Sequence, residues 1–262
     1  MLDNLSPARR RLVVSLVGLA IAGLVLATVV LLRTREPSVN QVSQTDVGPV
    51  VLVPGYGGST TALDVLATAL KAQGRDATVL QLAGDGTGDL RVQAQLLDAA
   101  VASALERTGA PSVDIVGYSA GGVVARLCVA DMGGASLARR VLTIGSPHHG
   151  TDVARLAAGL GATDCQLACQ QLVPDSDLLR QLNAGDETPD GPLWVSMWTT
   201  SDEIVIPVVS AHLDGAVNFS IQSVCGAAPI EHGDLPRNPS VIALTIEELN
   251  QAVPSIPRSG DC

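Results

Sequence analysis

Short runs rich in Val, Ile and Leu alternate with longer amphipathic stretches along most of this chain, and this alternation limits the folds open to it. Parallel neighbouring strands need crossover connections, usually helices, so the pattern predicts βαβ units and an α/β fold with a parallel sheet. Six strands are expected, over residues 48–53, 77–82, 112–118, 139–144, 193–199 and 216–224. Helices are expected over 60–73, 89–107, 120–131 and 239–252, with two short helical pieces inside 151–190.

The composition agrees with an α/β fold and argues against one class of partner. Hydrophobic residues make up 47% of the 262 residues and aromatic residues only 2%, so the core must consist mostly of Val, Leu, Ile and Ala, as in helix-covered parallel sheets. Residues 1–36 hold five Arg and two acidic residues, which leaves 11 basic and 24 acidic residues and a net charge of −13 for the rest. Phosphate binding needs clustered Lys and Arg, so no nucleic-acid partner is expected.

An uncharged apolar run covers residues 12–32, after a basic tail at residues 1–11. As a helix the run would be about 31 Å long, which matches the apolar core of a bilayer. Arg9, Arg10 and Arg11 precede it, so we expect a transmembrane anchor in the cell membrane with a cytoplasmic N-terminus. A cleaved signal peptide and a buried core helix are the alternatives, but the run is long for a signal and has no small-x-small cleavage site.

The first two of these interpretations both place the rest of the chain outside the cytoplasm, as a membrane-attached or a secreted domain. Residues 33–48 are polar and are expected to be a flexible linker, followed by one α/β domain over 49–262.

Five cysteines fit export of that domain. Four cysteines can pair in three ways, and the sequence does not choose among them. Cys165 and Cys169 are close enough for a local bridge, and a bridge from Cys225 to Cys262 would hold the C-terminal tail. Cys128 falls within an apolar helical pattern and is expected to be a buried free thiol. No Cys-x-x-Cys or Cys/His cluster has the spacing of a structural zinc site, and neither a metal nor an organic cofactor is expected.

A G-x-S-x-G motif, Gly117-Tyr118-Ser119-Ala120-Gly121, lies between a predicted strand and a predicted helix. This is the strand-turn-helix setting of a nucleophile elbow, in which a tight turn strains the serine backbone and the glycines leave room for neighbouring backbone. Ser119 is therefore the predicted nucleophile. A glycine-rich turn with an idle serine is the alternative.

A serine nucleophile needs a base that is oriented by an acid, and in this type of fold the order along the chain is serine, acid, histidine. Asp202 is the expected acid because it lies just after the strand predicted at 193–199, at the carboxyl end of the sheet where ligands gather. Glu203 and Asp177 are the alternatives.

The expected base is His232, which lies after the last predicted strand and before the last predicted helix. His212 is a weaker candidate because it comes only ten residues after Asp202 and before that strand. His148 and His149 precede any plausible acid strand, so chain order argues against both.

Catalysis at an ester carbonyl also needs backbone N–H groups that face the developing oxyanion. One donor is expected to be Ala120, which follows the nucleophile, and the other Tyr56, in the glycine-rich loop Pro54-Gly55-Tyr56-Gly57-Gly58. A phosphate-binding loop is the usual competitor for such a sequence, but the G-K-[ST] ending and the G-x-G-x-x-G pattern are both missing.

Together these motifs resemble the small bacterial lipases of the α/β-hydrolase superfamily, also called class 2 lipases. The resemblance rests on VLVPGYGGS (51–59), DIVGYSAGG (114–122), VLTIGSPHHGT (141–151), TTSDEIVIP (199–207) and EHGDL (231–235), within residues 49–250. It implies a minimal six-stranded hydrolase sheet, a triad of Ser119, Asp202 and His232, and oxyanion donors at Tyr56 and Ala120. It also implies that the His-x-Gly-Thr stretch is mostly structural. The first loop often begins His-Gly in relatives and here begins Pro-Gly, which leaves its orientation open.

The expected function is hydrolysis of a lipid or small-molecule ester through an acyl-enzyme, without a cofactor. Acyl transfer to an alcohol, as in remodelling of envelope lipids, shares the first chemical step, and a noncatalytic binding protein on a hydrolase scaffold is a third possibility. Residues 151–190 are too few for a large lid domain. The leucines of this stretch could form the wall of an acyl site or belong to the core; they are Leu156, Leu160, Leu167 and Leu172.

Overall fold

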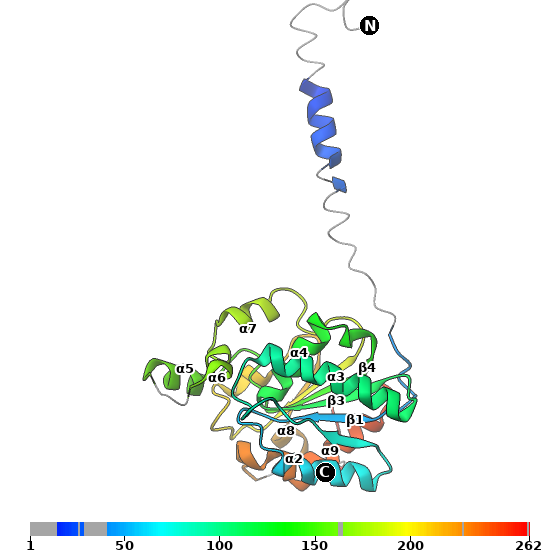
Figure 1. Ribbon diagram of the computed structural model, residues 1–262, viewed down its shortest axis with the longest axis vertical. Helices are drawn as coiled ribbons and strands as arrows, with labels where there is room; N and C mark the ends of the chain where they lie inside the picture. Colours follow the sequence, from blue (N-terminus) through cyan, green and yellow to red (C-terminus); the bar gives the residue numbers. More distant parts are fainter. Residues whose placement is uncertain (1–14, 26, 29–40, 162–164, 227, 261) are drawn as a thin grey trace, which may run out of the picture. The chain divides into compact units, whose positions relative to one another are not determined.

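The computed structural model describes residues 15–25, 27–28, 41–161, 165–226, 228–260 and 262 (Figure 1). The chain forms two compact units, Met1–Val39 and Asn40–Cys262. In the first unit, residues 15–25 are helical. Within the described residues, no helix combines the length and the hydropathy that crossing a membrane requires. Parts of the run at 12–32, like the basic tail and the first half of the linker, lie outside the described residues, so the anchor stays a prediction.

The second unit is built around a six-stranded parallel sheet with strand order β2-β1-β3-β4-β5-β6. The strands are β1 (Val50–Val53), β2 (Ala77–Val79), β3 (Val113–Tyr118), β4 (Ala138–Ile144), β5 (Leu193–Trp198) and β6 (Val217–Ser220). All five neighbouring pairs are parallel, which confirms the predicted fold class. Because β3 lies inside the sheet between β1 and β4, the turn that follows it is surrounded by other strand ends.

Helices cover both faces of this sheet (Figure 1). The longer ones are α2 (Thr61–Ala72), α3 (Leu90–Thr108), α4 (Ala120–Asp131) and α9 (Pro239–Asn250). Shorter helical segments connect the strands; they are η2 (Gly134–Ser136), α5 (Asp152–Gly159), α6 (Leu167–Gln171), α7 (Asp177–Leu182), η3 (Val208–Ala211), α8 (Ile221–Cys225) and η4 (His232–Arg237). Buried side chains of α3 and α4 belong to one core layer, and those of α2, α8 and α9 belong to the other.

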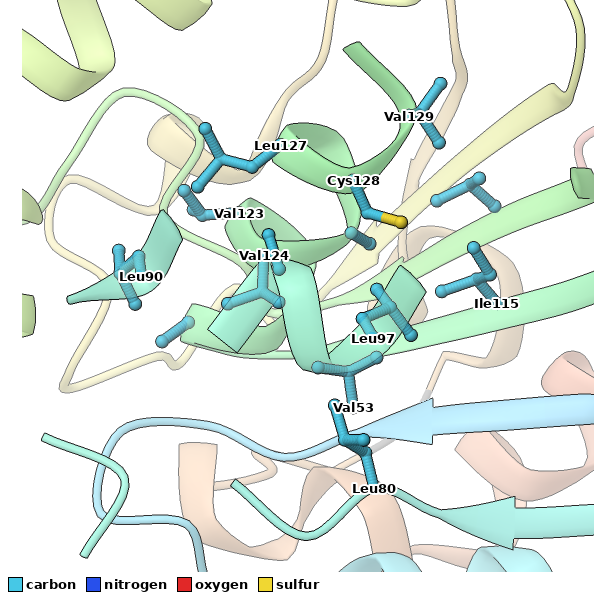
Figure 2. Close-up of a cluster of buried hydrophobic side chains, with 14 of the residues drawn as sticks. Val53, Leu80, Leu90, Leu97, Ile115, Val123, Val124, Leu127, Cys128 and Val129 are labelled. Atoms are coloured by element: carbon cyan, nitrogen blue, oxygen red, sulfur yellow. The ribbon is translucent and has the colours of Figure 1, made fainter. Parts of the chain in front are cut away.

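The pleat of the strands divides the core between the two layers. Val51 and Val53 point into the layer formed with α3 and α4, whereas Val50 and Leu52 point into the opposite layer. This follows from the two-residue period of a strand. Because both faces of the sheet are covered, most strand residues are apolar. Figure 2 shows the first layer, in which the side chains of Val53 and Ile115 lie in one cluster with those of Leu97, Val123 and Val124.

Two predicted strand boundaries were wrong. The strand expected over 216–224 ends at Ser220, where the serine hydroxyl accepts the N–H of Ser223 and starts helix α8. A serine at this position is a good helix N-cap, which ends the strand. The strand expected over 77–82 ends at Val79, because β2 is an edge strand whose partner β1 is only four residues long.

Two disulfides link the cysteines in the way considered from the sequence. Cys165 is bonded to Cys169, and Cys225 is bonded to Cys262. Cys128 is a buried free thiol, and burial raises the pKa of this thiol to about 12. Its thiol therefore stays protonated and packs as an apolar group.

Two buried arginines near the amino end of β4 connect the central strands to the C-terminal helix. Arg139 holds Asp114 with two hydrogen bonds, Nε to Oδ1 at 2.9 Å and Nη2 to Oδ2 at 2.6 Å. The same guanidinium donates to the Leu249 carbonyl at 2.6 Å, and Arg140 donates to the Glu248 carbonyl at 2.6 Å. These carbonyls belong to the last turn of α9, where the helix itself provides no N–H donors for them. The arginines therefore fix the C-terminal helix against the sheet.

The side chain of Glu248, beside these arginines, gives the domain a pH-dependent stability. It is 0% exposed, and burial raises the pKa of its carboxyl from 4.5 to about 7, although Arg140 acts in the opposite direction. The pKa of Glu248 is higher in the folded domain than in the unfolded chain, so the protonated carboxyl favours the folded state. This contribution to the free energy of unfolding is fully present below the unfolded pKa and is lost as the pH rises through about 7. We expect Glu248→Gln to exceed the wild type in unfolding free energy by up to about 3 kcal/mol near pH 8, and to match it near pH 4.

Urea titrations of the full chain at the two pH values test this expectation. Glu106→Gln, at an exposed position of α3, is the control for the loss of one negative charge. An equal gain in both variants, or a Glu248→Gln difference that does not change with pH, would contradict the assignment.

Candidate active site

The strand-turn-helix motif forms a strained turn at Ser119, directly between β3 and α4. Ser119 has φ 53° and ψ −127°, a conformation that side-chain-bearing residues rarely adopt. Its N–H donates to the Ile144 carbonyl at 2.9 Å, which fastens the turn to the end of β4. Only glycine fits beside it: a Cβ on Gly117 would lie 2.5 Å from Gly122 Cα, and one on Gly121 would lie 2.2 Å from the Val53 oxygen.

Asp202 lies four residues after the end of β5, and its carboxylate is held by the backbone. Oδ1 accepts the N–H groups of Ile204 at 3.0 Å and Val205 at 2.7 Å. Oδ2 is left to face the ring of His232, whose Nδ1 lies 2.8 Å away. The carboxylate therefore has a fixed orientation before it contacts the histidine.

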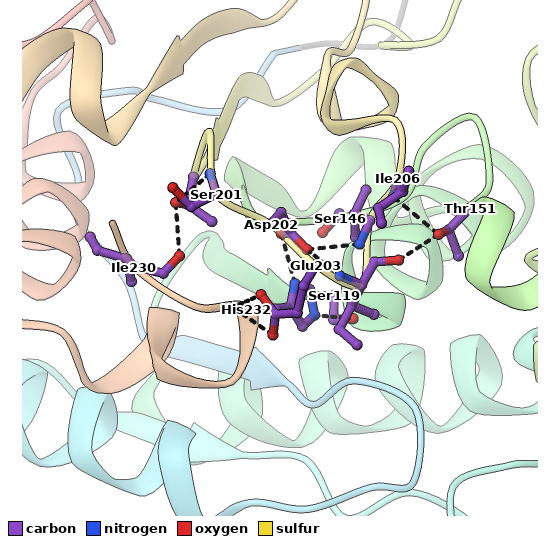
Figure 3. Close-up of polar contacts among 12 residues, drawn as sticks. Ser119, Ser146, Thr151, Ser201, Asp202, Glu203, Ile206, Ile230 and His232 are labelled. Carbon is purple, nitrogen blue, oxygen red and sulfur yellow. Dashed lines mark hydrogen bonds and ion pairs between the residues drawn. The ribbon is translucent and has the colours of Figure 1, made fainter. Parts of the chain in front are cut away.

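His232 begins segment η4, and its ring joins the carboxylate to the serine. Nε2 of the ring lies 2.9 Å from Ser119 Oγ, on the side opposite to Asp202 (Figure 3). The three residues are 9%, 7% and 5% exposed for Ser119, Asp202 and His232. Loops that follow β3, β5 and β6 thus bring the three predicted residues into one hydrogen-bonded row at the carboxyl edge of the sheet.

The backbone of His232 is itself held on two sides. Its N–H donates to the carboxylate of Glu203, with distances of 3.2 and 3.0 Å to the two oxygens. Its carbonyl accepts the hydroxyl of Tyr118 at 3.0 Å. Burial, followed by the charges of Asp202 and Glu203, raises the pKa of Tyr118, so this hydroxyl remains a donor. The motif analysis did not indicate either supporting role, although both residues are next to a predicted site residue in the sequence.

The other candidate acids and bases lie in different surroundings. Glu203 binds the His232 backbone and not its ring, and exposed Asp177 pairs with Arg180 within α7. His212 is partly exposed, and its Nδ1 lies 3.5 Å from Asp214 Oδ1.

The two consecutive histidines after β4 have structural contacts. His148 is fully buried, with Nε2 3.1 Å from the Thr143 hydroxyl, and burial, followed by the charge of Arg126, lowers the pKa of its ring well below the usual value. His149 Nε2 lies 2.8 Å from Glu187 Oε1, and this hydrogen bond raises the pKa of the His149 ring.

The expected oxyanion donors border the serine. Ala120 is the first residue of α4, so its N–H is one of the four that have no acceptor inside the helix. Tyr56 lies in the loop after β1, and it lines a pocket together with Ser119. This loop approaches closely, since a Cβ on Gly55 would lie 2.9 Å from Ser119 Cβ. Their donor roles remain a prediction.

The pocket beside Ser119 has a volume of about 300 Å³ and is mostly apolar. Its walls come from the β1 and β4 loops, the Asp202 loop, and helices α5 and α6 with their flanking residues; the wall residues besides Ser119 are Tyr56, Pro147, Thr151, Val153, Ala154, Ala157, Cys165, Cys169, Leu172, Ile204 and Val205. Of the four leucines named above, Leu172 alone is among them, and the other three are exposed on α5, at its end and on α6. Within the described residues, no group of three or more His, Cys, Asp or Glu side chains could hold a metal ion.

Comparison with known proteins agrees with this architecture. Residues 94–223, which include the strained turn and Asp202, match the family described as Lipase (class 2). Aspergillus fumigatus lipase B is similar in structure, with a TM-score of 0.67 and 21% sequence identity over 80% of this chain and 54% of the lipase. The mature form of a Bacillus licheniformis lipase gives a TM-score of 0.62 and 18% identity, over 82% of this chain and 96% of that enzyme.

At such identities the solved structures establish the fold alone, and the chain spans about half the length of the fungal lipase. The family match adds a similarity to class 2 lipases that includes the strand-turn-helix motif and the loop after β5. The chain therefore has the α/β-hydrolase fold, and it is similar to class 2 lipases over residues 94–223.

Proposed function

We propose that this chain hydrolyses carboxylic esters through an acyl-enzyme on Ser119, with His232 as general base and acid and Asp202 as the residue that orients it. The observation that carries the proposal is the row of contacts from Ser119 Oγ to His232 Nε2 at 2.9 Å and from His232 Nδ1 to Asp202 Oδ2 at 2.8 Å. A serine hydroxyl is a weak nucleophile on its own, and a row of this kind is what activates it.

In the first step, Ser119 Oγ bonds to the ester carbonyl carbon while its proton passes to His232 Nε2. Asp202 stabilises the imidazolium, because its carboxylate accepts a hydrogen bond from the N–H of His232 Nδ1 while the proton stays on the ring. The carbonyl electron pair moves to oxygen, where the N–H groups of Tyr56 and Ala120 stabilise the negative charge. The intermediate collapses, His232 gives its proton to the departing alcohol, and the acyl group remains on Ser119.

In the second step, water takes the place of the alcohol. His232 accepts a proton as the water oxygen bonds to the acyl carbon, and it returns that proton to Ser119 Oγ when the acid leaves. The apolar pocket beside Ser119 supports an ester with an apolar acyl part, and the match to a lipase family supports the same class of substrate.

Replacement of the nucleophile tests the proposal. We expect Ser119→Ala to reduce kcat for p-nitrophenyl esters by roughly 10⁴-fold or more, because the remaining groups cannot form the acyl-enzyme. The full chain is compared with Ser119→Ala and with Ser136→Ala, an exposed serine in η2. A fluorophosphonate probe should label the wild type and Ser136→Ala, but not Ser119→Ala.

If Ser119→Ala kept the activity, or if the folded wild type neither labelled nor hydrolysed any ester, the proposal would be overturned. Labelling without hydrolysis, together with product formation when an alcohol acceptor is added, would replace hydrolysis by acyl transfer.

Glu203 is proposed as a positioning residue for His232, because its carboxylate accepts the backbone N–H of that residue. A hydrogen bond to a charged group contributes about 1.5–3 kcal/mol, so Glu203→Ala should lower kcat by roughly 10- to 100-fold with little change in KM. Glu203→Gln keeps an oxygen acceptor at the same place and should restore most of the loss. Equal kcat values for Ala and Gln would contradict a role through this hydrogen bond.

We further propose that residues 12–32 anchor the chain in a membrane, with the catalytic domain on the non-cytoplasmic side. The apolar run after Arg9–Arg11 supports the anchor, and two disulfides support an oxidising compartment. The full chain should sediment with membranes, resist extraction with alkaline carbonate, keep its N-terminal residues by mass spectrometry, and be digested by protease added to intact spheroplasts. A shortened chain in the medium would favour a cleaved signal, and an unprocessed, soluble, protease-protected chain would exclude both.

A further inference from the structure

The apolar pocket beside Ser119 lies between two short helical stretches that the reaction itself does not use. α5 contributes Val153, Ala154 and Ala157, whose spacing places them on one face of the helix. The second stretch contributes Cys169 of α6, together with Cys165 before the helix and Leu172 at its end. None of the described residues that line this pocket carries a charge. An apolar chain extending from the reacting carbonyl would therefore lie between these two walls.

The α6 wall includes a disulfide. Cys165 and Cys169 both line the pocket and are bonded to each other, with Cα atoms 5.1 Å apart. Cys165 is almost fully buried, so the bridge is part of the inner surface of the pocket. The disulfide thus forms part of the surface that a chain in this pocket would contact.

Hydrogen bonds attach the α6 side of the pocket to the N-terminal end of helix α3. Gln171 accepts the N–H of Leu90 at 2.8 Å and donates to Asp89 Oδ1 at 2.7 Å. The N–H of Ala168 donates to the Thr87 carbonyl at 3.0 Å. Because these contacts lie at the N-terminus of α3, the wall cannot move outward without breaking them.

The opposite wall is fixed mainly at its beginning. The N–H of Thr151 donates to the Leu172 carbonyl at 3.0 Å, and the N–H of Asp152 donates to the Ile206 carbonyl at 2.7 Å. Beyond these bonds, Ala154 is the one buried residue of α5. Ala157, one turn further along, faces the pocket with a single methyl group.

We propose that this pocket holds the acyl chain of the substrate and that the Cys165–Cys169 disulfide sets the greatest chain length that fits. The substrate class is then an ester of a short to medium fatty acid, because a cavity of about 300 Å³ with a covalent bridge in its wall limits the chain. This inference rests on the proposed ester hydrolysis at Ser119.

A larger side chain at Ala157 tests the pocket. With p-nitrophenyl esters from acetate to palmitate, Ala157→Leu should lower kcat/KM for octanoate relative to acetate by roughly tenfold or more, since a methylene-sized change in an apolar site alters specificity on that scale. Ala158→Leu is the matched control, because it adds the same volume to the same helix at a residue that does not line this pocket. If both variants keep the wild-type profile, the acyl chain does not bind here.

Removal of the bridge tests the role of the disulfide. Cys165→Ala/Cys169→Ala should raise kcat/KM for laurate relative to butyrate by roughly tenfold, because two sulfur atoms leave the wall. Cys225→Ala/Cys262→Ala removes the other bridge, which has no part in the pocket, and should leave that ratio unchanged. Fluorophosphonate labelling gives the fraction of each variant with a folded site, and rates are expressed per labelled enzyme.

The two proposals fail in different ways. Activity that survives Ser119→Ala overturns the hydrolytic mechanism regardless of chain length. An enzyme that labels at Ser119 and hydrolyses esters, but whose chain-length profile is the same in the wild type and in the bridge and Ala157 variants, overturns only the pocket inference. If the ratio of kcat/KM for laurate to that for butyrate rose equally in both double-alanine variants, the cause would be a general loosening of the fold. That result would also overturn the pocket inference.

Discussion

The close contact between the turn after β3 and the backbone around it is the constraint on which the rest of the site depends. Gly117 and Gly121 allow α4 to approach β1 and β3 within distances at which no Cβ would fit. That approach forces Ser119 into its strained conformation and lifts its side chain out of the sheet. Without it, the serine hydroxyl would not meet the ring of His232, whatever the other loops did.

The two edges of the sheet carry different kinds of residues: the candidate catalytic residues lie at the carboxyl edge, and buried arginines that stabilise the fold lie at the amino edge. At the carboxyl edge, the strand ends present Ser119, Asp202 and His232 in one row. At the amino edge, Arg139 and Arg140 bind the last carbonyls of α9, the helix that follows the segment starting at His232. The charged contacts at the amino edge therefore also hold in place the C-terminal part of the chain that carries the histidine.

Much of this arrangement could be predicted because it depends on local patterns and chain order. Alternating strands and helices determine a parallel sheet, and a parallel sheet brings the loops after β3, β5 and β6 to one edge. The strand predicted over 216–224 was wrong beyond Ser220, because a single capping hydroxyl outweighs an apolar pattern there.

Other features depend on three-dimensional contacts that the sequence does not contain. Asp202 and Glu203 are consecutive carboxylates, and only the path of the loop decides that one faces the imidazole ring and the other its backbone. Likewise, Leu172 and not the neighbouring leucines borders the pocket, because Leu156, Leu160 and Leu167 point outward from short helices that cannot bury two faces.

The conformation of Ser119 also has a consequence for how this fold can change over time. A backbone at φ 53° costs a side-chain-bearing residue about 1–3 kcal/mol, and glycine would remove that cost. Replacing Ser119, the proposed nucleophile, by glycine would therefore stabilise the turn. Selection for stability and selection for the proposed turnover therefore oppose each other at this position, and a lineage released from the second would gain stability by acquiring glycine here.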